Sequence, residues 1–349
     1  MKAAVLHGKE DVRLEEVPER PLAPGELRVR IGAALTCGTD LKVFKRGYHA
    51  KMLVPPTVFG HELAGEVVEV QSSEFKVPGQ PWVVGDRVVV ANSAPCDDCG
   101  ACARDQQGLC DDLLFLNGAY AESIVVPARL VEKNLLRLQP GTAFRDAALT
   151  EPLACVVQGV EETQLAAGQR VLVIGAGPIG LMFVALAKQL GCEAAVAGRG
   201  EARLNAARRL GASEVFDVGT DGDSVKAVTA RLPKPNFDAV IEAVGKPEAW
   251  EAAVKLVRKG GTVNFFGGCP AGTSVSLDTG LIHYSNLTLR ASFHHTPRTI
   301  RRALAFIESG VIRAADFVDG ECALSELPSL FARMTAGNRV VKTLVDVRR

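Results

Sequence analysis

The sequence lacks a net charge, a long apolar run and an export signal. Lysine plus arginine and aspartate plus glutamate both number 40 among 349 residues, so no basic surface is expected to attract a nucleic-acid backbone. No run approaches the roughly 18 apolar residues of a membrane span. Charged residues interrupt the first twenty positions before a signal-peptide core can form. We therefore expect a soluble cytoplasmic protein with neither nucleic acid nor a membrane as its partner.

Cysteine is clustered rather than paired along the chain. Nine cysteines are present, an odd number, and Cys96, Cys99, Cys102 and Cys110 lie close together in one segment. Without an export signal, this clustering favours metal over a disulfide framework. The spacing lets four thiolates converge on one tetrahedral zinc ion, and a site with four protein ligands is structural. Four free thiols and an iron–sulfur cluster are the alternatives.

Acidic residues surround this cysteine cluster. Four aspartates flank it, namely Asp97, Asp98, Asp111 and Asp112. Because like charges repel one another, we expect the metal to offset their repulsion as well as to order the loop.

Length and sequence texture indicate two domains. A single core rarely grows beyond about 250 to 300 residues, and this chain is longer. Up to about residue 150, valine-rich runs at 26–31, 66–70 and 87–90 lie between turn-forming residues and predict a β-rich unit. From about residue 155, strand and helix patterns alternate, which predicts a doubly wound parallel sheet. The expected strands are 170–174, 193–197, 214–216, 238–241 and 262–266, and the expected helices are 181–190, 203–210 and 250–258.

The last part of the chain is expected to leave this alternating region. Thr296 and Pro297 are typical of a helix start, and Gly310 of a helix end. After residues 286–292 we therefore expect the tail to return to the first domain.

A glycine motif follows the first strand of the alternating region. It reads Gly175-Ala-Gly177-Pro178-Ile179-Gly180 and lies between a predicted strand and a predicted helix. Gly175 permits the tight turn, Gly177 the close approach of a pyrophosphate and Gly180 the packing of helix on strand. Pro178 and Ile179 belong to the same cofactor-binding segment, and the N-terminus of the helix that the motif opens faces the anion with free amides. The motif predicts dinucleotide binding, and a simple turn is the alternative.

The strand at 193–197 bears on the choice of cofactor. It leads into Gly198-Arg199-Gly200, with no acid where NAD enzymes place one for the ribose diol. Arg199, helped by Arg203, is suited to pair with the 2′-phosphate of NADP. We therefore expect NADP or NAD, with NADP favoured. The alternative is that Arg199 stacks on adenine or stays solvated, and that either cofactor binds.

A second candidate metal site combines different residue types. Cys37, His61 and Glu62 offer a thiolate, an imidazole and a carboxylate, a set suited to zinc with an open position. Alone this set is a weak signal. A single cysteine more often packs in the core, and a single histidine more often makes a structural hydrogen bond, than either binds a metal. The surrounding motifs strengthen it: Cys37-Gly-Thr-Asp40, Gly60-His-Glu-Leu-Ala-Gly65, Gly85-Asp-Arg-Val88, the cysteine cluster and the glycine motif.

In this order of motifs the chain resembles the zinc-containing medium-chain dehydrogenase family over nearly its whole length, closest to the sorbitol and threonine dehydrogenase branches. The resemblance implies an α/β protein with a GroES-like β-rich catalytic domain, a doubly wound Rossmann domain and an active site in the cleft between them. The expected bounds are 1–152 with 294–349 for the catalytic domain and 153–293 for the Rossmann domain. It also implies a homodimer or homotetramer, and two zinc ions per chain, one catalytic and one structural.

The resemblance assigns roles at the open metal site. Cys37 and His61 would be ligands of the catalytic zinc, and Glu62 a ligand or a carboxylate close beside it. Glu151 stands where many relatives have a cysteine, and a glutamate there resembles the sorbitol and threonine branches, in which it binds zinc directly or through its water. For Glu151, a buried carboxylate that caps the following helix is the alternative.

The same resemblance gives a proton path. Thr39 matches the serine or threonine that accepts the proton of the substrate hydroxyl, and Asp40 would fix the tautomer of His61. Lys42 stands where threonine-type enzymes commonly have a histidine, so the relay would run through Lys42 or through ribose and water. For His294 and His295, an ordinary surface loop is the main expectation.

Further cofactor contacts follow from the resemblance alone. They lie at the ends of later strands, near the adenine ribose and the nicotinamide. The expected residues are Val244, Gly245, Gly267, Gly268 and Phe293.

Together these residues imply an NAD(P)-linked, zinc-dependent alcohol dehydrogenase. Hydride would pass between a secondary alcohol, or its ketone, and nicotinamide, while zinc lowers the pKa of the alcohol. Glu151 favours a polyol, cyclitol or hydroxy-amino acid over ethanol. The alternatives are a zinc-independent quinone or enone reductase of the same superfamily and a noncatalytic nucleotide-binding relative. Cys37, His61, Glu62 and the cysteine cluster together argue against the reductase. The presence of Cys37, His61 and Thr39 argues against the noncatalytic relative.

Overall fold

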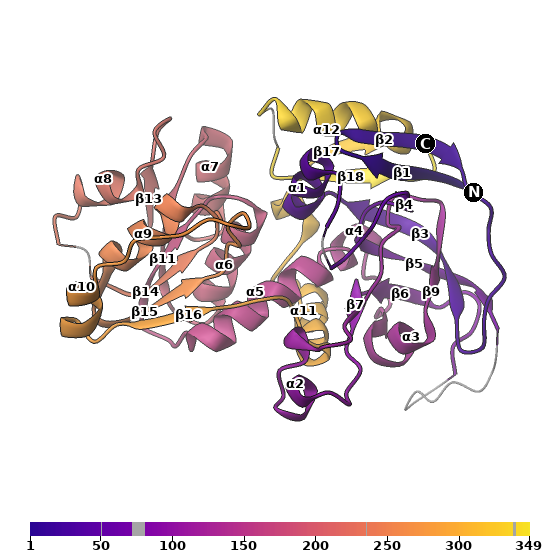
Figure 1. Ribbon diagram of the computed structural model, residues 1–349, viewed down its shortest axis with the longest axis horizontal. Coiled ribbons are helices and arrows are strands. Elements are labelled where there is room, and N and C mark those ends of the chain that lie inside the picture. The colour runs from indigo at the N-terminus through magenta and orange to yellow at the C-terminus, as the bar shows by residue number, and fades with distance from the viewer. Residues whose placement is uncertain (50, 72–80, 235, 338–339) are drawn as a thin grey trace. The chain divides into compact units, whose positions relative to one another are not determined.

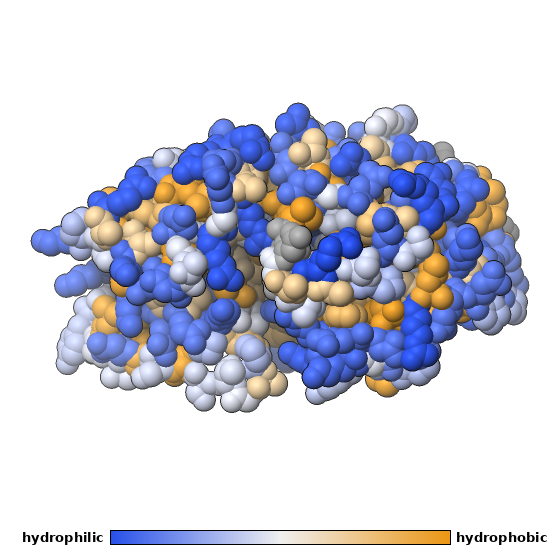
Figure 2. Space-filling view, turned by 90° about the horizontal axis from the view of Figure 1, so that it is seen from above, coloured by the Kyte–Doolittle hydropathy of each residue, from blue (hydrophilic) through white to orange (hydrophobic). Residues whose placement is uncertain are grey.

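The computed structural model describes residues 1–49, 51–71, 81–234, 236–337 and 340–349, which form two compact units (Figure 1). The first unit comprises Met1–Ala154 and His295–Arg349, and the second comprises Cys155–His294. Across the described ranges, no helix combines the length and the apolar character needed to cross a bilayer. On the face drawn in Figure 2, hydrophilic side chains interrupt the apolar patches.

The first unit is rich in β-strands, as the valine-rich runs predict. Its strands are β1 (Lys2–Gly8), β2 (Asp11–Glu16), β3 (Leu27–Leu35), β4 (Thr57–Val58), β5 (Glu62–Val70), β6 (Arg87–Val90), β7 (Ser93–Ala94), β8 (Leu114–Phe115), β9 (Ser123–Val126), β10 (Leu135–Arg137), β17 (Val318–Ala323) and β18 (Lys342–Asp346). The largest sheet has the order β10-β6-β5-β3-β18-β17, and β9 also pairs with β3. A smaller sheet has the order β2-β1-β4, and β7 pairs with β8. The sheet therefore brings the C-terminal β18 beside the N-terminal β3.

Short helices complete the first unit. They are α1 (Gly38–Arg46), α2 (Gly100–Ala103), α3 (Ala128–Asn134), α4 (Phe144–Ala147), α5 (Thr150–Thr163), which continues into the second unit, α11 (Pro297–Glu308) and α12 (Leu327–Thr335), with single 3-10 turns at Gln107–Leu109, Ala314–Asp316 and Leu324–Glu326. The start of α11 is the predicted one: Thr296 accepts a hydrogen bond from the amide of Thr299, and Pro297 follows it. Because α11 contacts α3 and α4, the tail returns to the first unit.

An aromatic cluster fills part of the core of the first unit. Phe59, Tyr120 and Phe331 are fully buried, and Phe44 stacks on Phe331 with ring centroids 5.2 Å apart. Phe59 lies 5.8 Å from Tyr120 and 5.5 Å from Phe331, distances at which aromatic pairs attract one another. Phe44 is in α1 and Phe331 in α12, whereas Phe59 lies between β4 and β5 and Tyr120 between β8 and β9. The cluster therefore packs both helices against these two connecting segments.

The second unit is the predicted doubly wound sheet. Its strands are β11 (Arg170–Ile174), β12 (Glu193–Gly198), β13 (Glu214–Asp217), β14 (Phe237–Glu242), β15 (Val257–Phe265) and β16 (Thr288–Ala291), and its helices are α6 (Pro178–Gln189), α7 (Glu201–Arg209), α8 (Ser224–Thr229), α9 (Pro247–Leu256) and α10 (Thr279–Tyr284). All five strand pairs are parallel, in the order β13-β12-β11-β14-β15-β16. The strand order reverses between β11 and β14, where such sheets bind ligands at the carboxyl ends of their strands.

Several predicted element bounds in the second unit are wrong, and the strand expected at 262–266 already begins at Val257. The helix expected at 250–258 ends at Leu256, because Val257 already has extended backbone and pairs with Phe237 in the sheet. The helix expected at 181–190 starts earlier, at Pro178, because proline at the first position of a helix needs no amide hydrogen. Pairing with a neighbouring strand is a tertiary effect that local periodicity does not contain.

A buried ion pair joins two strands of the large sheet. Lys342 opens β18 and Glu62 opens β5, and both strands border β3. The ammonium of Lys342 contacts the carboxylate of Glu62 and donates a 2.8 Å hydrogen bond to the carbonyl of Thr36. Lys342 is 2% exposed and Glu62 is fully buried. Removing either partner leaves the other charge buried without its counterion, which is more costly than losing an exposed pair.

We predict that Lys342→Met destabilises the protein by about 3–5 kcal/mol, because the Glu62 carboxylate then has no counterion. The measurement is the urea midpoint of unfolding of the whole chain. A matched control is Arg13→Met, which breaks the exposed pair between Arg13 and Asp11 and should leave the midpoint nearly unchanged. The double variant Glu62→Gln with Lys342→Met should recover much of the loss. A Lys342→Met midpoint equal to that of the native chain would contradict this account.

Candidate functional site

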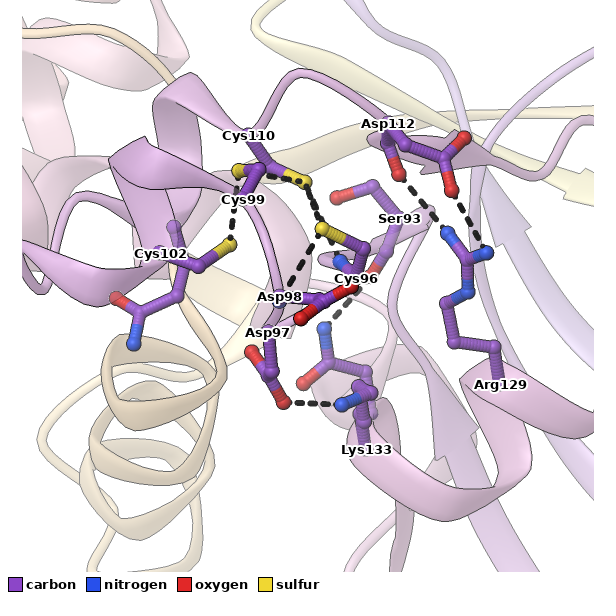
Figure 3. A network of polar contacts seen from close by, with 12 residues as sticks. Ser93, Cys96, Asp97, Asp98, Cys99, Cys102, Cys110, Asp112, Arg129 and Lys133 are labelled. Atoms are coloured by element: carbon purple, nitrogen blue, oxygen red, sulfur yellow. Dashed lines mark hydrogen bonds and ion pairs between the residues drawn. The ribbon is translucent and has the colours of Figure 1, made fainter.

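The four clustered cysteines converge in one loop of the first unit. The loop lies between β7 and β8 and carries α2. Sulfur atoms are 3.4 Å apart between Cys96 and Cys110, 3.5 Å between Cys99 and Cys102, and 3.9 Å between Cys99 and Cys110 (Figure 3). Four sulfurs at about 2.3 Å from one zinc ion would be about 3.8 Å from one another. The donor set therefore fits a closed tetrahedral zinc site.

Backbone amides also point at these sulfurs. Cys96 donates its amide to the sulfur of Cys110 at 3.2 Å, and Asp111 donates to that of Cys99 at 3.4 Å. The Asp111 amide, together with that of Cys102, lowers the pKa of Cys99 to about 6. Because thiolate is the form that binds metal, Cys99 is prepared for an ion, whereas burial raises the pKa of Cys102 to about 12 and that of Cys110 above its ordinary value, so these two thiols lose their protons as the metal binds.

The aspartates around the cysteines have partners that the sequence did not suggest. Asp97 pairs with Lys133, and Asp112 accepts from Arg129 at 2.8 Å (Figure 3). Both cations come from α3. The expectation that metal must offset the repulsion among these acids is therefore wrong for Asp97 and Asp112, because cations of a neighbouring helix already balance them.

The second candidate set gathers on the sheet of the first unit. One ligand atom each from Cys37, His61 and Glu62 lies within 4.8 Å of the others. Cys37 caps α1, and its sulfur accepts from the amide of Thr39 at 3.4 Å. His61 and Glu62 stand at the start of β5, next to β3, whose last residue precedes Thr36 and Cys37. Residues distant in the sequence are thus joined by strand pairing.

Asp40 fixes the imidazole of His61. Its Oδ1 lies 2.9 Å from Nδ1 of His61, and both side chains are buried. With Nδ1 held by the carboxylate, Nε2 is left for a metal, as in carboxylate–histidine–zinc arrangements. Burial alone lowers the pKa of His61, but the charges of Asp40 and Cys37 raise it well above its ordinary value. The pocket therefore favours positive charge at this position.

Glu62 divides its carboxylate between two surroundings. Oε2 contacts Lys342, whereas Oε1 is buried and has no hydrogen-bond partner among the described residues. Glu62 thus has a buried oxygen without a partner, and its carboxylate offers a ligand atom within 4.8 Å of those of Cys37 and His61, which fits a site for a cation or its water. Lys342 was not found from the sequence, because it lies 280 residues from Glu62 and carries no motif of its own.

Glu151 lies outside the set formed by Cys37, His61 and Glu62. It belongs to the first turn of α5, where burial raises its pKa to about 7. Its Oε1 is 4.0 Å from Nε2 of His295, which also lies 2.8 Å from Oδ1 of Asn92. The surface position expected for His295 is wrong, since that side chain is buried. Asn92 was missed because no sequence motif contains it.

The two residues of the expected proton path lie on α1. Thr39 is half-buried in its first turn, one residue before Asp40, whereas Lys42 is exposed. Tyr120 was not singled out from the sequence, yet its hydroxyl donates to Oδ2 of Asp40 at 2.5 Å. It lies 80 residues from Asp40, in a segment without a recognised motif.

The glycine motif of the second unit adopts the expected geometry. Gly175 directly follows β11 with φ 117°, and Gly177 caps α6, whose first residues are Pro178 and Ile179. A Cβ on Gly180 would lie 1.8 Å from the carbonyl oxygen of Gly175, so no larger residue fits there. A Cβ on Gly177 would meet no atom within 4 Å. The close packing at Gly180 and the open space at Gly177 fit a pyrophosphate cradle.

The later strand ends lie close to this motif within the second unit. Val244 packs against Gly175. A Cβ on Gly175 would lie 3.0 Å from the side chain of Val244. A Cβ on Gly267 would lie 2.3 Å from the amide nitrogen of Gly245, and Gly268 follows directly. Glu242, missed from the sequence, accepts from the amides of Val244 at 2.7 Å and Gly245 at 2.9 Å. It holds this turn in shape. Phe293 is half-exposed beyond β16.

The residues after β12 are available to a ligand. Gly198 ends the strand, and a Cβ there would lie 2.5 Å from that of Ala176 in the glycine motif. Arg199 is exposed and Arg203 partly exposed in α7. Strand pairing also places Asp217 beside Gly198, and the Asp217 carboxylate accepts from the amide of Gly219 at 3.0 Å. The sequence did not indicate this acid, because it ends a different strand.

Comparison with known proteins gives these sites a family. Residues 23–135 match the alcohol dehydrogenase GroES-like domain, and residues 178–309 match the zinc-binding dehydrogenase domain. A sorbitol dehydrogenase of Bacillus subtilis is 28% identical over 100% of this chain and 98% of its own length. An L-threonine 3-dehydrogenase of Pyrococcus furiosus is 35% identical over 83% of this chain and 80% of its own length.

Solved structures agree in fold. A zinc-binding dehydrogenase from Sinorhizobium meliloti 1021, bound to NADP, has a TM-score of 0.87 and 28% identity, with 99% of this chain and 98% of that chain covered. The open metal set, the closed cysteine set and the glycine cradle are thus found in a chain with this family's fold. The chain therefore belongs to the zinc-type medium-chain alcohol dehydrogenase family, with a GroES-like unit and a Rossmann-type unit, and is a zinc-dependent, NAD(P)-linked oxidoreductase of alcohols.

Proposed function

We propose that this dehydrogenase transfers hydride between a secondary alcohol of the polyol, cyclitol or hydroxy-amino acid class, or its ketone, and NAD(P). The observation that carries the proposal is the buried set of Cys37, His61 and Glu62, with His61 oriented by Asp40. The substrate class is supported by similarity to a sorbitol dehydrogenase and an L-threonine 3-dehydrogenase. Glu151, in place of a cysteine, agrees with that class.

In this proposal each residue near the open site has one task. Cys37 and His61 hold the catalytic zinc, and Glu62 lies beside it with its free Oε1. Glu151 binds the zinc directly or through its water, although it is not one of the set Cys37, His61 and Glu62. Thr39, at the start of α1, accepts the proton of the substrate hydroxyl and passes its own proton on through Lys42 or through ribose and water. When bound, zinc stabilises the deprotonated alcohol near neutral pH.

The second unit would position the cofactor. Gly175, Gly177 and Gly180, with Pro178 and Ile179, would receive the pyrophosphate at the N-terminus of α6. The remaining contacts proposed are Gly198, Arg199, Arg203, Val244, Gly245, Gly267, Gly268 and Phe293. Precise alignment of carbinol carbon and nicotinamide, with exclusion of water, is what the protein would add to the chemistry of the cofactor.

We further propose two zinc ions per chain, a preference for NADP, and a homodimer or homotetramer. The closed cysteine set supports the structural zinc. The exposed Arg199 after β12, with Arg203 in α7, supports NADP. The domain bounds proposed are 1–152 with 294–349 for the catalytic domain and 153–293 for the Rossmann domain.

The substrate class can be tested with a panel of alcohols. Sorbitol, xylitol, myo-inositol, 2,3-butanediol, L-threonine and ethanol are offered with NAD and NADP, and reduced nicotinamide is followed by absorbance. We expect a secondary alcohol of the panel to exceed ethanol in kcat/KM.

Thr39→Val should lower kcat roughly 100-fold or more, as loss of a proton-transfer group does. Full activity of Cys37→Ser would instead favour a zinc-independent reductase.

Metal analysis tests the zinc count. The native chain should contain close to two zinc ions, Cys37→Ser close to one, and Cys102→Ser close to one. The two variants should differ in stability, because only the cysteine cluster holds its loop together through metal. Cys102→Ser should therefore unfold at lower temperature than Cys37→Ser. One zinc in the native chain, unchanged in Cys37→Ser, would contradict the open site.

The cofactor preference is tested by Arg199→Asp. Loss of a charge-assisted hydrogen bond to the 2′-phosphate should weaken NADP binding by roughly 10- to 100-fold, with little change for NAD. Fluorescence titration of each cofactor gives both dissociation constants. Arg208→Asp, an exposed change at the far end of α7, is the matched control. Equal weakening of both cofactors by Arg199→Asp would refute the pairing with 2′-phosphate.

A further inference from the structure

We propose that Tyr120 is a positioning residue of the open metal site, whose hydroxyl holds the Asp40 carboxylate in the orientation that fixes His61. The inference rests on the proposed function, in which His61 binds the catalytic zinc. It concerns the oxygen of Tyr120 rather than its ring, because the oxygen is the part that reaches Asp40.

The ring of Tyr120 is held firmly in place. Tyr120 is fully buried, 5.8 Å from Phe59 and 6.3 Å from Phe331 between ring centroids. Its edge lies against Gly60, where a Cβ would be 2.7 Å from the ring, and Gly60 has φ 86°. Gly60 directly precedes His61. Tyr120 therefore packs against the backbone that carries the imidazole and contacts the carboxylate that orients it.

The hydroxyl has one strong acceptor. It lies 2.5 Å from Oδ2 of Asp40 and 3.2 Å from the carbonyl oxygen of Leu35. A tyrosine has one hydroxyl proton, and a carboxylate accepts it more strongly than a carbonyl does. Burial raises the pKa of Tyr120 well above its ordinary value, and the Asp40 charge raises it further. The hydroxyl therefore remains a donor to Asp40.

Asp40 depends on this donor. Its Oδ2 accepts from Tyr120 and, at 3.1 Å, from the amide of Cys37, while its Oδ1 faces His61. Asp40 is 1% exposed, so bulk water has no access to replace a lost partner. Without the hydroxyl, Oδ2 keeps the Cys37 amide alone, and the carboxylate can rotate away from His61.

The consequence is specific to one metal site. Groups that hydrogen-bond to a metal ligand, without touching the metal, typically contribute a factor of about 10–100 to metal affinity. Asp40 itself would remain in a Tyr120→Phe variant, so we place the expected loss near the lower end, at roughly 10-fold. The cysteine cluster contains neither residue and should keep its affinity. Because Tyr120→Phe keeps the ring that packs against Gly60, a loss at the open site is assigned to the hydroxyl.

The experiment uses the full-length zinc-loaded protein and Tyr120→Phe, which removes one oxygen and keeps the ring. Zinc affinity at each site is measured by competition with a chromophoric chelator, and the geometry of the open site by the visible spectrum of a cobalt-substituted sample. We expect the open site to release zinc at roughly 10-fold lower chelator concentration and the cobalt spectrum to shift. Tyr284→Phe, on a tyrosine that is 83% exposed, is the matched control.

A double-mutant cycle tests whether Tyr120 acts through Asp40. If it does, adding Tyr120→Phe to Asp40→Ala leaves the zinc affinity of the open site at the Asp40→Ala value. Unchanged affinity in Tyr120→Phe, equal loss at both sites, or an additive loss in the double variant would each overturn the proposal. A native protein without zinc at Cys37 and His61 would contradict the proposed function itself. The zinc contents of the native chain and of Cys37→Ser decide that point, and they are measured before any Tyr120 variant is made.

Discussion

The carboxylate of Asp40 is the point on which the open site depends. One oxygen faces the imidazole of His61, and the other accepts from the amide of Cys37 and the hydroxyl of Tyr120. The bond from the Cys37 amide also starts helix α1, since Asp40 and Cys37 form its capping box. Helix start, sulfur position and imidazole orientation are therefore fixed together. Because the surroundings are buried and of low dielectric, each of these bonds is stronger than it would be in water, and each is costly to lose.

Charge balance is the second constraint on the first unit. Asp40, His61, Glu62, Glu151 and Lys342 are all buried, although burial disfavours charge on each of them. Lys342 balances Glu62 and Asp40 balances His61, while burial raises the pKa of Glu151 to about 7. A divalent ion at Cys37 and His61 would change this balance, because its positive charge favours ionised carboxylates nearby. The protein thus keeps a set of buried charges whose mutual arrangement suits a cation. Strands β5 and β18, which both border β3, bring Glu62 beside Lys342.

The sequence was sufficient for the parts of the molecule that are local. The glycine motif, the cysteine cluster and the start of α11 each lie within a short segment, and spacing alone predicted their geometry. The set of Cys37 and His61 was predicted from the order of family motifs. Lys342, Tyr120 and the cations Arg129 and Lys133 were not, because each meets its partner only through tertiary packing; Lys342, for example, lies 280 residues from Glu62. The end of the helix at Leu256 was also misjudged, since sheet pairing at Val257 overrides the helical pattern.

The two metal sets differ in whether the residues that hold them in place are local or distant in the sequence. The four cysteines come from one loop between β7 and β8, so their geometry is set by that loop, its amides and the salt bridges to α3. The open set joins the cap of α1 to the start of β5. Its orientation depends on Asp40 in the first turn of α1, and on Tyr120 and Lys342 from two further places in the chain. A closed site can therefore be made by local folding and metal binding. An open site, which must hold its ligands rigid while leaving room for substrate, needs support from residues that never touch the metal.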